Sequence, residues 1–265
     1  MIEPIVERGK IPGMVAVLLN SERIIAEGIA GVRKRCDSAP ITTDDQFLLC
    51  SATKAMTATL AAIAVEEGKL AWSSTLGASL PDLAAHMHPD WKAVTLAQLL
   101  ARRAGVPGTG ESFWTSLQVH FSSASEKEKR RDVVTKILSR TPNYPPGSRY
   151  VYADIGYVIV GAMLEDVFGR SWEDLMLEKI WQPLGLTTAG FGAPGSEDQI
   201  DQPWGHWGMV FTGRPVAPGG FFSRLNPPAF FGPAATARMT VFDWSKSPRF
   251  TCVAIPPTRI TPRPC

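Results

Sequence analysis

Residues Ser51–Glu67 constrain the fold most, because this alanine-rich segment contains neither glycine nor proline and ends at Gly68. Glycine directly after such a segment is typical of a helix C-terminus. The sequence therefore predicts a long buried helix here. The strand-like residues Gln46–Leu49 lead into it.

Further helices are predicted in the middle of the chain, each stopped by glycine or proline: Thr95–Arg103, Lys129–Ser139, Tyr157–Phe168 and Trp172–Ile180. Met14–Leu19 and Arg23–Ala30 flank a polar turn at Asn20-Ser21 and predict a β-hairpin. A lone hairpin is marginal in water, so this one must pack on a helix or join further strands. Residues 190–232 are rich in glycine, proline and aromatics, which predicts a functional or pocket-lining loop.

Composition excludes several classes of protein. A chain of 265 residues with 45% hydrophobic residues can bury a core, as one large domain or two small ones. Its net charge of +2 gives no reason to expect a nucleic-acid partner. No apolar run approaches the roughly 20 residues that cross a bilayer, and Met1–Lys10 lacks a secretory signal. We expect no membrane partner and a cytoplasmic location, with an upstream leader left open.

The four cysteines are too few and too scattered for a disulfide scaffold, and no C-x-x-C suggests zinc. They fit a reducing compartment.

Ser51-Ala52-Thr53-Lys54 is the sharpest local motif. Residues three apart share a helix face, so the Ser51 hydroxyl and the Lys54 amine can meet. A desolvated lysine can take the proton of a serine nucleophile, and the first helical turn stabilises an adjacent oxyanion. S-x-x-K also arises about once by chance in a chain of this length. From this context alone, catalysis and coincidence are equally good interpretations.

A second cluster surrounds Tyr152 and Asp154, which follow the turn Pro145-Pro146-Gly147 and precede a predicted helix. Rigid loops in this position commonly carry site residues. The simpler alternative is that the tyrosines are partly buried aromatics with hydrogen-bonded hydroxyls. Taken alone, the cluster favours that alternative.

Together these motifs resemble the serine β-lactamase and penicillin-binding-protein superfamily, in its class C-like branch of β-lactamases, D-amino-acid peptidases and esterases. The resemblance runs in order through Ile11-Pro12-Gly13, Phe47–Lys54, Val94–Leu100, Gly105-Val106-Pro107, Pro145-Pro146-Gly147, Tyr152–Tyr157, Pro183–Leu186, Asn226-Pro227-Pro228, Gly232-Pro233-Ala234 and Asp243-Trp244. It implies an α+β fold of the β-lactamase/transpeptidase type, with an antiparallel sheet packed on helices beside a mostly helical region.

The resemblance also implies a serine hydrolase without a cofactor. Ser51 attacks the carbonyl of a small ester or amide, with esterase, β-lactamase and D-alanyl peptidase activity all open, and forms an acyl-enzyme. Lys54 and Tyr152 form the base that moves protons. The meeting of Tyr152 with Ser51 comes from the family, not from the spacing.

Two departures from the family pattern concern the site. The loop motif reads Tyr-Ser-Asn or Tyr-Ala-Asn in the family, whereas its third position here is Asp154. A carboxylate beside Lys54 favours the charged ammonium and weakens it as a base, which slows the chemistry or moves its pH optimum upward. The family's Leu-Leu-x-His-x-Ser-Gly reads here as Leu99–Gly105 with Arg102 and Ala104, so the local loop packing is expected to differ.

The largest departure lies at the end of the chain. The family places Lys-Thr-Gly or His-x-Gly on a later strand, followed by more strands and a helix, whereas here the resemblance ends after Lys246. We therefore expect an incomplete β-lactamase-like domain at 1–246 and a proline- and arginine-rich tail at 247–265, as after a frameshift or truncation.

Loss of those strands would remove the hairpin's sheet partners and one oxyanion donor. Two structural consequences stay open: Thr251–Ile255 supplies a replacement strand, or the chain forms a homodimer by strand exchange. The function alternative is a catalytically impaired remnant that binds such ligands or is slowly acylated by them.

Three other patterns have simpler interpretations. His206-Trp207-Gly208 fits His-x-Gly but precedes the Asn-Pro-Pro segment, so a loop histidine is the default, and we group His206 and Trp207 with Asp154 as candidate substrate-binding residues. His86-Met87-His88 lacks ligand partners at metal spacing and predicts a surface loop, with no metal site. The charged run Glu126–Arg131 predicts a solvated helix start.

Overall fold

The computed structural model describes residues 2–20, 22–108, 119, 122–207, 213–220 and 227–246. Gly208 and Asn226 of the quoted motifs lie outside this range. The tail 247–265 also lies outside it, with the expected replacement strand Thr251–Ile255.

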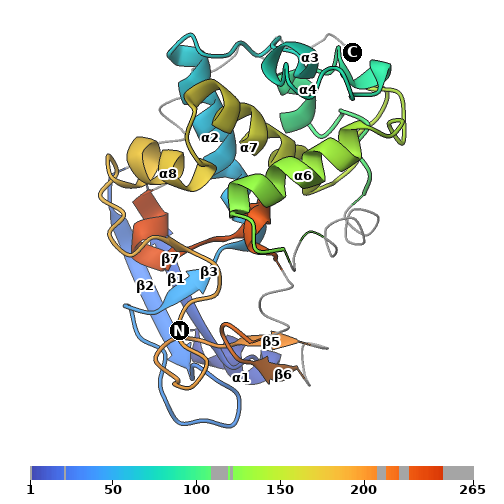
Figure 1. Ribbon diagram of the computed structural model, residues 1–265. Coiled ribbons are helices and arrows are strands. Elements are labelled where there is room, and N and C mark those ends of the chain that lie inside the picture. Colours follow the sequence, from blue (N-terminus) through green and yellow to red (C-terminus); the bar gives the residue numbers. More distant parts are fainter. Residues whose placement is uncertain are drawn as a thin grey trace, which may run out of the picture.

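Most of the helices lie in one half of the molecule, whereas the hairpin and the short N-terminal helix Glu3–Gly9 lie in the other (Figure 1). We call the first part the helical half; its helices are α2 (Thr53–Glu66), α3 (Leu76–Ser79), α4 (Leu96–Leu100), α6 (Glu126–Leu138), α7 (Ile155–Phe168) and α8 (Trp172–Met176). Shorter elements connect and flank them: 3-10 helices at Cys50–Ala52, Pro89–Trp91 and Ala229–Phe231, a short π-helix at Leu177–Trp181 and the single helical turn α10 (Gly232–Ala235). The predicted helices are thus confirmed to within a few residues at their ends.

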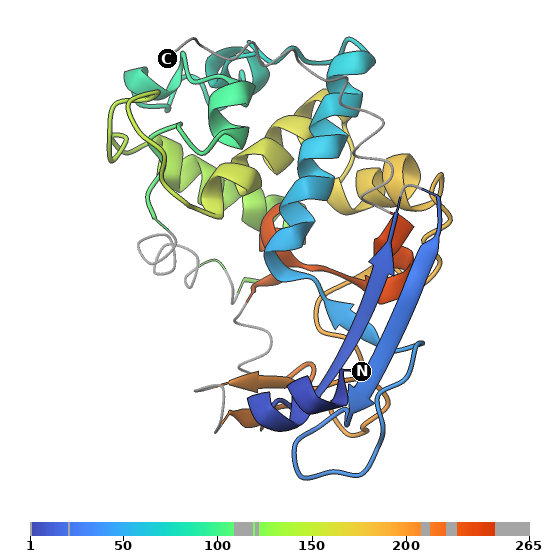
Figure 2. The same ribbon diagram turned by 180° about the vertical axis from the view of Figure 1, so that it is seen from behind.

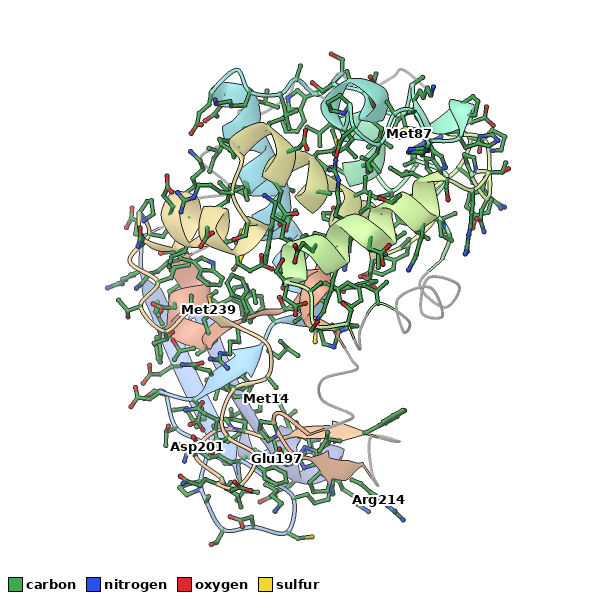
Figure 3. All side chains as sticks on the ribbon, viewed as in Figure 1. Met14, Met87, Glu197, Asp201, Arg214 and Met239 are labelled. Carbon is green, nitrogen blue, oxygen red and sulfur yellow. The ribbon has the colours of Figure 1, made fainter. Side chains whose placement is uncertain are left out.

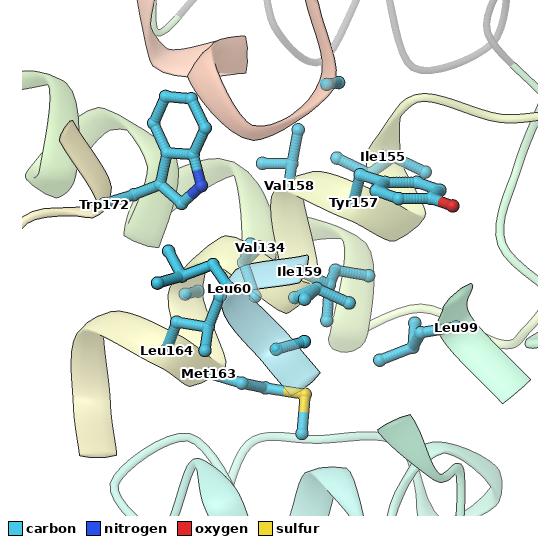
Figure 4. Packing of buried hydrophobic residues seen from close by; sticks show 14 of the residues in the cluster. Leu60, Leu99, Val134, Ile155, Tyr157, Val158, Ile159, Met163, Leu164 and Trp172 are labelled. Carbon is cyan, nitrogen blue, oxygen red and sulfur yellow. The ribbon is translucent and has the colours of Figure 1, made fainter. Parts of the chain in front are cut away.

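Helix α7 lies at the centre of the core. Every residue from Ile155 to Glu165 is buried, and Leu60 of α2, Ile159 and Leu164 pack together in Figure 4. Each such fully buried aliphatic side chain contributes roughly 1.5–3 kcal/mol of transfer free energy. The helix ends at Gly169, whose φ of 70° permits a left-handed cap.

The charged run at the start of α6 corrects one prediction. The helix does begin with a capping box, in which Ser125 and Glu128 satisfy each other's backbone groups. Arg130, however, is fully buried and not solvated. It pairs with Glu165, with Glu173 at 2.6 Å and with the carbonyl of Phe230 at 3.1 Å, so the guanidinium joins α6, α7 and α8.

The predicted hairpin is confirmed as β1 (Gly13–Leu19) and β2 (Ile24–Gly31), paired antiparallel from Gly13 opposite Gly31 to Leu19 opposite Ile24. A helix that the sequence analysis did not identify, α1 (Glu3–Gly9), packs against β2 at one end of the hairpin (Figure 2). Among the described residues, β1 and β2 form a sheet with each other alone.

A three-stranded sheet lies between the hairpin and the helices (Figure 1). Its order is β3-β7-β4, with bounds β3 (Gln46–Leu48), β7 (Ala237–Thr240) and β4 (Gly190–Phe191). Met239 of β7 and Met14 of β1 lie in this strand-rich part of the molecule, whereas Met87 lies among the helices (Figure 3).

The predicted long loop carries β4 and the small antiparallel pair β5 (Gly205–Trp207) and β6 (Arg214–Val216). Across the described ranges, none of the helices has the length and apolar character needed to span a bilayer.

Candidate active site

Ser51 lies at the junction between β3 and α2. Cys50 has a left-handed φ of 46°, which turns the chain sharply from the strand into the 3-10 turn Cys50–Ala52. Ser51 is exposed and lies two residues before the first residue of α2. Because the N-terminal end of a helix carries partial positive charge, negative charge that develops beside Ser51 is stabilised.

Lys54 occupies the first turn of α2 and is 2% exposed. Its Nζ donates to Ser51 Oγ at 3.0 Å, to Asp154 Oδ1 at 2.6 Å and to the carbonyl oxygen of Ala234 at 2.9 Å. These three contacts match the three N–H bonds of an ammonium group. The ion pair with Asp154 and the contact with the Ala234 carbonyl therefore fix the Lys54 amine beside Ser51 Oγ.

Tyr152 approaches Ser51 from the loop that precedes α7. Its hydroxyl lies 2.6 Å from Ser51 Oγ, and Lys54 Nζ lies 5.3 Å from the centre of its ring. The side chain is 42% exposed, whereas the next residue, Ala153, is buried. The buried neighbour fixes the backbone, and the phenol stays open to the solvent side of the serine.

Two threonines of α2 hold the segment that supplies the Ala234 carbonyl. Thr57 Oγ1 donates to the Pro233 carbonyl at 2.7 Å, and Thr53 Oγ1 accepts from the Ala237 N–H at 3.1 Å. Gly232-Pro233-Ala234 is one of the motifs of the family resemblance, but no role was predicted for it. Its contribution to the site is the backbone carbonyl of Ala234, which a pattern of side chains in the sequence does not reveal.

A cavity of about 610 Å³ adjoins the serine through Cys50. Apolar and aromatic side chains dominate its wall, which includes Val32, Ile41, Phe47, Leu48, Trp204 and Val216. His206 and Trp207 of β5 also line it, so they belong to the cavity and not to the hydrogen-bonded cluster at Ser51.

His206 is held as a neutral ring in this wall. Its Nε2 accepts the backbone N–H of Arg35 at 3.1 Å, and desolvation by burial lowers its pKa. Trp207 is 61% exposed at the rim of the cavity. Arg33, a further wall residue, is neutralised by the buried carboxylate of Asp45 at 2.6 Å. The described wall thus presents a largely uncharged surface.

The described residues contain no group of three or more histidine, cysteine or acidic side chains that could hold a metal ion. His88 instead caps the turn at Pro89, where its Nδ1 accepts the Asp90 N–H at 3.3 Å.

The predicted cluster converges at one point of the structure, where Lys54 Nζ contacts both Ser51 and Asp154 and the Tyr152 hydroxyl contacts Ser51. Its chemistry is that of a serine hydroxyl in contact with two proton-transfer groups.

The comparisons with known proteins agree with this arrangement. The model of the beta-lactamase family matches residues 1–244. The unguisins hydrolase ungD′ of Aspergillus campestris is 25% identical over 70% of this chain and 34% of its own length. The beta-lactamase of Escherichia coli K12 is 28% identical over 77% of this chain and 50% of its own length. The chain thus spans about a third to a half of the length of these curated relatives.

Solved structures confirm the predicted α+β fold. The structure of EstCE1, a hydrolase with promiscuous acyltransferase activity, superposes with a TM-score of 0.72 over 92% of this chain and 68% of its own, at 21% identity. The family match covers residues 1–244, which include the hairpin, Ser51, Tyr152 and β7. The chain therefore belongs to the beta-lactamase family.

Proposed function

We propose that the protein is a serine hydrolase that acts on a small ester or amide through an acyl-enzyme at Ser51. One observation carries the proposal: Ser51 Oγ lies within hydrogen-bond distance of both Lys54 Nζ, at 3.0 Å, and the Tyr152 hydroxyl, at 2.6 Å. Membership of a family of serine hydrolases supports it. The names of the relatives, a beta-lactamase and an unguisins hydrolase, are consistent with cleavage of carbonyl–heteroatom bonds.

In the acylation step, Ser51 Oγ forms a bond to the substrate carbonyl carbon. The Ser51 proton passes to the Tyr152 oxygen as Tyr152 releases its own hydroxyl proton toward the leaving-group atom, so the phenol stays neutral, and the carbonyl becomes an oxyanion beside the N-terminus of α2. Collapse of this intermediate breaks the bond to the leaving group, which departs with the proton that it received from Tyr152. The acyl group then remains as an ester on Ser51.

Deacylation reverses the same proton path. A water attacks the acyl carbon and gives a proton to the Tyr152 oxygen, Tyr152 passes its own hydroxyl proton to Ser51 Oγ, and the bond between the acyl carbon and Ser51 Oγ breaks. Asp154 and the Ala234 carbonyl hold the Lys54 amine in place. Lys54 Nζ donates to Ser51 Oγ and so orients the nucleophile.

The cavity beside Cys50 is the candidate substrate-binding side. We propose that His206 and Trp207 contact the acyl or leaving group there and that Asp154 acts by holding Lys54. An uncharged, largely apolar wall favours a neutral substituent on the substrate.

The decisive experiment is incubation with a p-nitrophenyl ester and with a fluorescent penicillin, using wild type and Ser51→Ala. Ser139→Ala is the matched control, because Ser139 is exposed at the end of α6, where its hydroxyl bonds only locally to the Lys136 carbonyl. The expected result is turnover and a covalent adduct in wild type and Ser139→Ala, and neither in Ser51→Ala. A wild-type signal no larger than that of Ser51→Ala refutes the proposal.

The Lys54–Asp154 ion pair favours a second candidate function, a ligand-binding protein that is acylated slowly and turns over poorly. Asp154 Oδ1 lies closer to Lys54 Nζ, at 2.6 Å, than Ser51 Oγ does, at 3.0 Å, so Asp154 engages the lysine and the proton path rests on Tyr152. The same incubation separates the candidates: a stable adduct at Ser51 without release of product identifies the binding protein.

The hairpin motivates a proposal about assembly, a homodimer formed by strand exchange. In the described part of the chain, β1 and β2 pair only with each other, and an open strand edge templates pairing with another chain. Light scattering tests this directly, because a monomer at all concentrations contradicts the exchange.

A further inference from the structure

Arg102 lies directly after α4, beside the loop that carries Tyr152. It occupies the place of the histidine in the family pattern, and its backbone is left-handed with φ of 58°. Left-handed backbone is unfavourable for residues other than glycine, asparagine and aspartate. The contacts that the side chain makes show what holds an arginine in this conformation.

The guanidinium faces the three tyrosines around the site. Its central carbon lies 4.5 Å from the ring centre of Tyr152, and 5.9 Å and 5.8 Å from those of Tyr150 and Tyr157. Nη1 donates to the Tyr150 hydroxyl at 2.7 Å. The Arg102 carbonyl also accepts the Val151 N–H at 2.9 Å. Arg102 thus contacts Tyr150 and Val151, the two residues before Tyr152, and also the ring of Tyr152 itself.

The charge of Arg102 is secure in this setting. Burial acts to lower its pKa, but the hydrogen bond to Tyr150 and the attraction of the three phenols raise it above the usual value. A permanent cation stacked on a tyrosine ring attracts it through the ring quadrupole. The charge that draws Arg102 to the Tyr152 ring is therefore present at neutral pH.

The local backbone and its burial do little to fix the orientation of the Tyr152 side chain. It is 42% exposed and belongs to a stretch without regular secondary structure. Free rotation about its side-chain bonds would carry the hydroxyl away from Ser51 Oγ. Misplacement of a proton-transfer group by about 1 Å can reduce a rate by two orders of magnitude.

We propose that Arg102 is a positioning residue that holds the phenol of Tyr152 against Ser51. The inference rests on the proposed function, and it adds a residue outside the Ser51–Lys54–Tyr152 cluster to the machinery. Arg102 acts through Tyr152 and not on the substrate, so its removal lowers kcat and leaves KM nearly unchanged.

Arg102→Gly is the variant that separates positioning from folding. Glycine adopts the left-handed backbone without strain, so relief of this strain offsets the lost side-chain contacts. The expected result is a kcat for a p-nitrophenyl ester about tenfold below wild type, a KM within about twofold and a thermal midpoint that is not lowered. Arg102→Lys keeps the charge without the planar stacking surface and should recover only part of the loss.

Arg103→Ala is the matched control. Arg103 is the adjacent arginine and binds the same loop, because its Nη2 donates to the Gly147 carbonyl at 2.8 Å. It makes no described contact with Tyr152. Its removal should leave kcat within about twofold of wild type.

A double-mutant cycle with Tyr152→Phe completes the test. Phenylalanine keeps the ring but lacks the hydroxyl, so Arg102→Gly should cause no further loss of kcat in that background. An equal tenfold loss there, or a wild-type kcat in the single Arg102→Gly variant, overturns the inference while leaving the proposed function intact. A wild-type rate equal to that of Ser51→Ala overturns the proposed function, and the inference with it.

Discussion

The helical half and the hairpin differ in how completely they bury their residues. In α7 every residue from Ile155 to Glu165 is buried, whereas β1 and β2, which are described in full, contain no buried residue. The site follows this division. Ser51 belongs to the 3-10 turn before α2 and Lys54 to the first turn of α2. Tyr152 belongs to the loop before α7, and the Ala234 carbonyl belongs to α10, which packs against α2.

The hairpin contributes differently. Its residue Gly13 and the adjoining Pro12 and Val32 form part of the cavity wall. The comparison teaches that the cluster around Ser51 is positioned by a closed core, while the cavity beside it is lined in part by a sheet with open edges. Loss of packing in the core should therefore disturb the chemistry, and changes to the hairpin should mainly disturb binding and assembly.

The largest effect is expected at the buried arginine of the helical half. Arg130→Met leaves the buried carboxylate of Glu165 and the partly buried carboxylate of Glu173 without their cation, which should lower the free energy of unfolding by about 3–5 kcal/mol. Arg131→Met is the matched control, because its ion pairs with Asp82 and Asp166 are partly exposed and contribute below about 1 kcal/mol. Urea unfolding measures both, and equal losses would contradict the buried network.

A pair of leucines compares the two halves directly. Leu60 in α2 is 0% exposed and Leu18 in β1 is 60% exposed. Leu60→Ala leaves a cavity in the core and should cost about 3 kcal/mol, whereas Leu18→Ala should cost less than about 0.5 kcal/mol. Thermal or urea unfolding of the two variants provides the measurement. A large loss for Leu18→Ala would show that the hairpin is covered in solution, as strand exchange requires.

The same division explains which parts of the fold the sequence predicted. The hairpin, α2 and α7 follow from local periodicity and glycine stops, and all three are present. Strand β7 was missed because Ala237–Thr240 is too short to show alternation and its partners β3 and β4 are distant in the chain. Helix α1 was missed because its seven residues carry a single buried side chain, Val6.

The site shows the same limit. Ser51 and Lys54 meet because they share a helix face, which spacing alone predicts. Tyr152 was placed there only by the family resemblance, since its contact with Ser51 joins residues 101 positions apart. Arg102 was noted as a departure that changes loop packing, and its stacking on Tyr152 depends on tertiary structure. Arg130 was misjudged because it belongs to a run of charged residues, while the carboxylates that pair with it lie on α7 and α8, distant in the chain.

Replacement of Asp154 by asparagine tests the chemistry supported by the helical half. Asp154→Asn restores the family residue and removes the carboxylate that holds Lys54 Nζ at 2.6 Å. We expect acylation to become several-fold faster because Lys54 is freed to engage Ser51 Oγ, with a stability loss of about 2 kcal/mol because a buried ion pair loses one partner. Single-turnover acylation and urea unfolding measure the two effects. Asp45→Asn is the comparison outside the cluster and should lower stability without any gain in rate.

The smallest effect is expected from His206, which belongs to the binding side. Burial lowers its pKa from the ordinary 6.5, so the folded protein holds it neutral while the unfolded chain still binds a proton. Stability contributed in this way is present above the unfolded pKa and is lost as the pH falls below 6.5. His206→Gln should therefore show a shallower fall in unfolding free energy between pH 6.5 and about 5 than wild type. A fall as steep as that of wild type in His206→Gln would mean that the cavity wall around His206 is open to water.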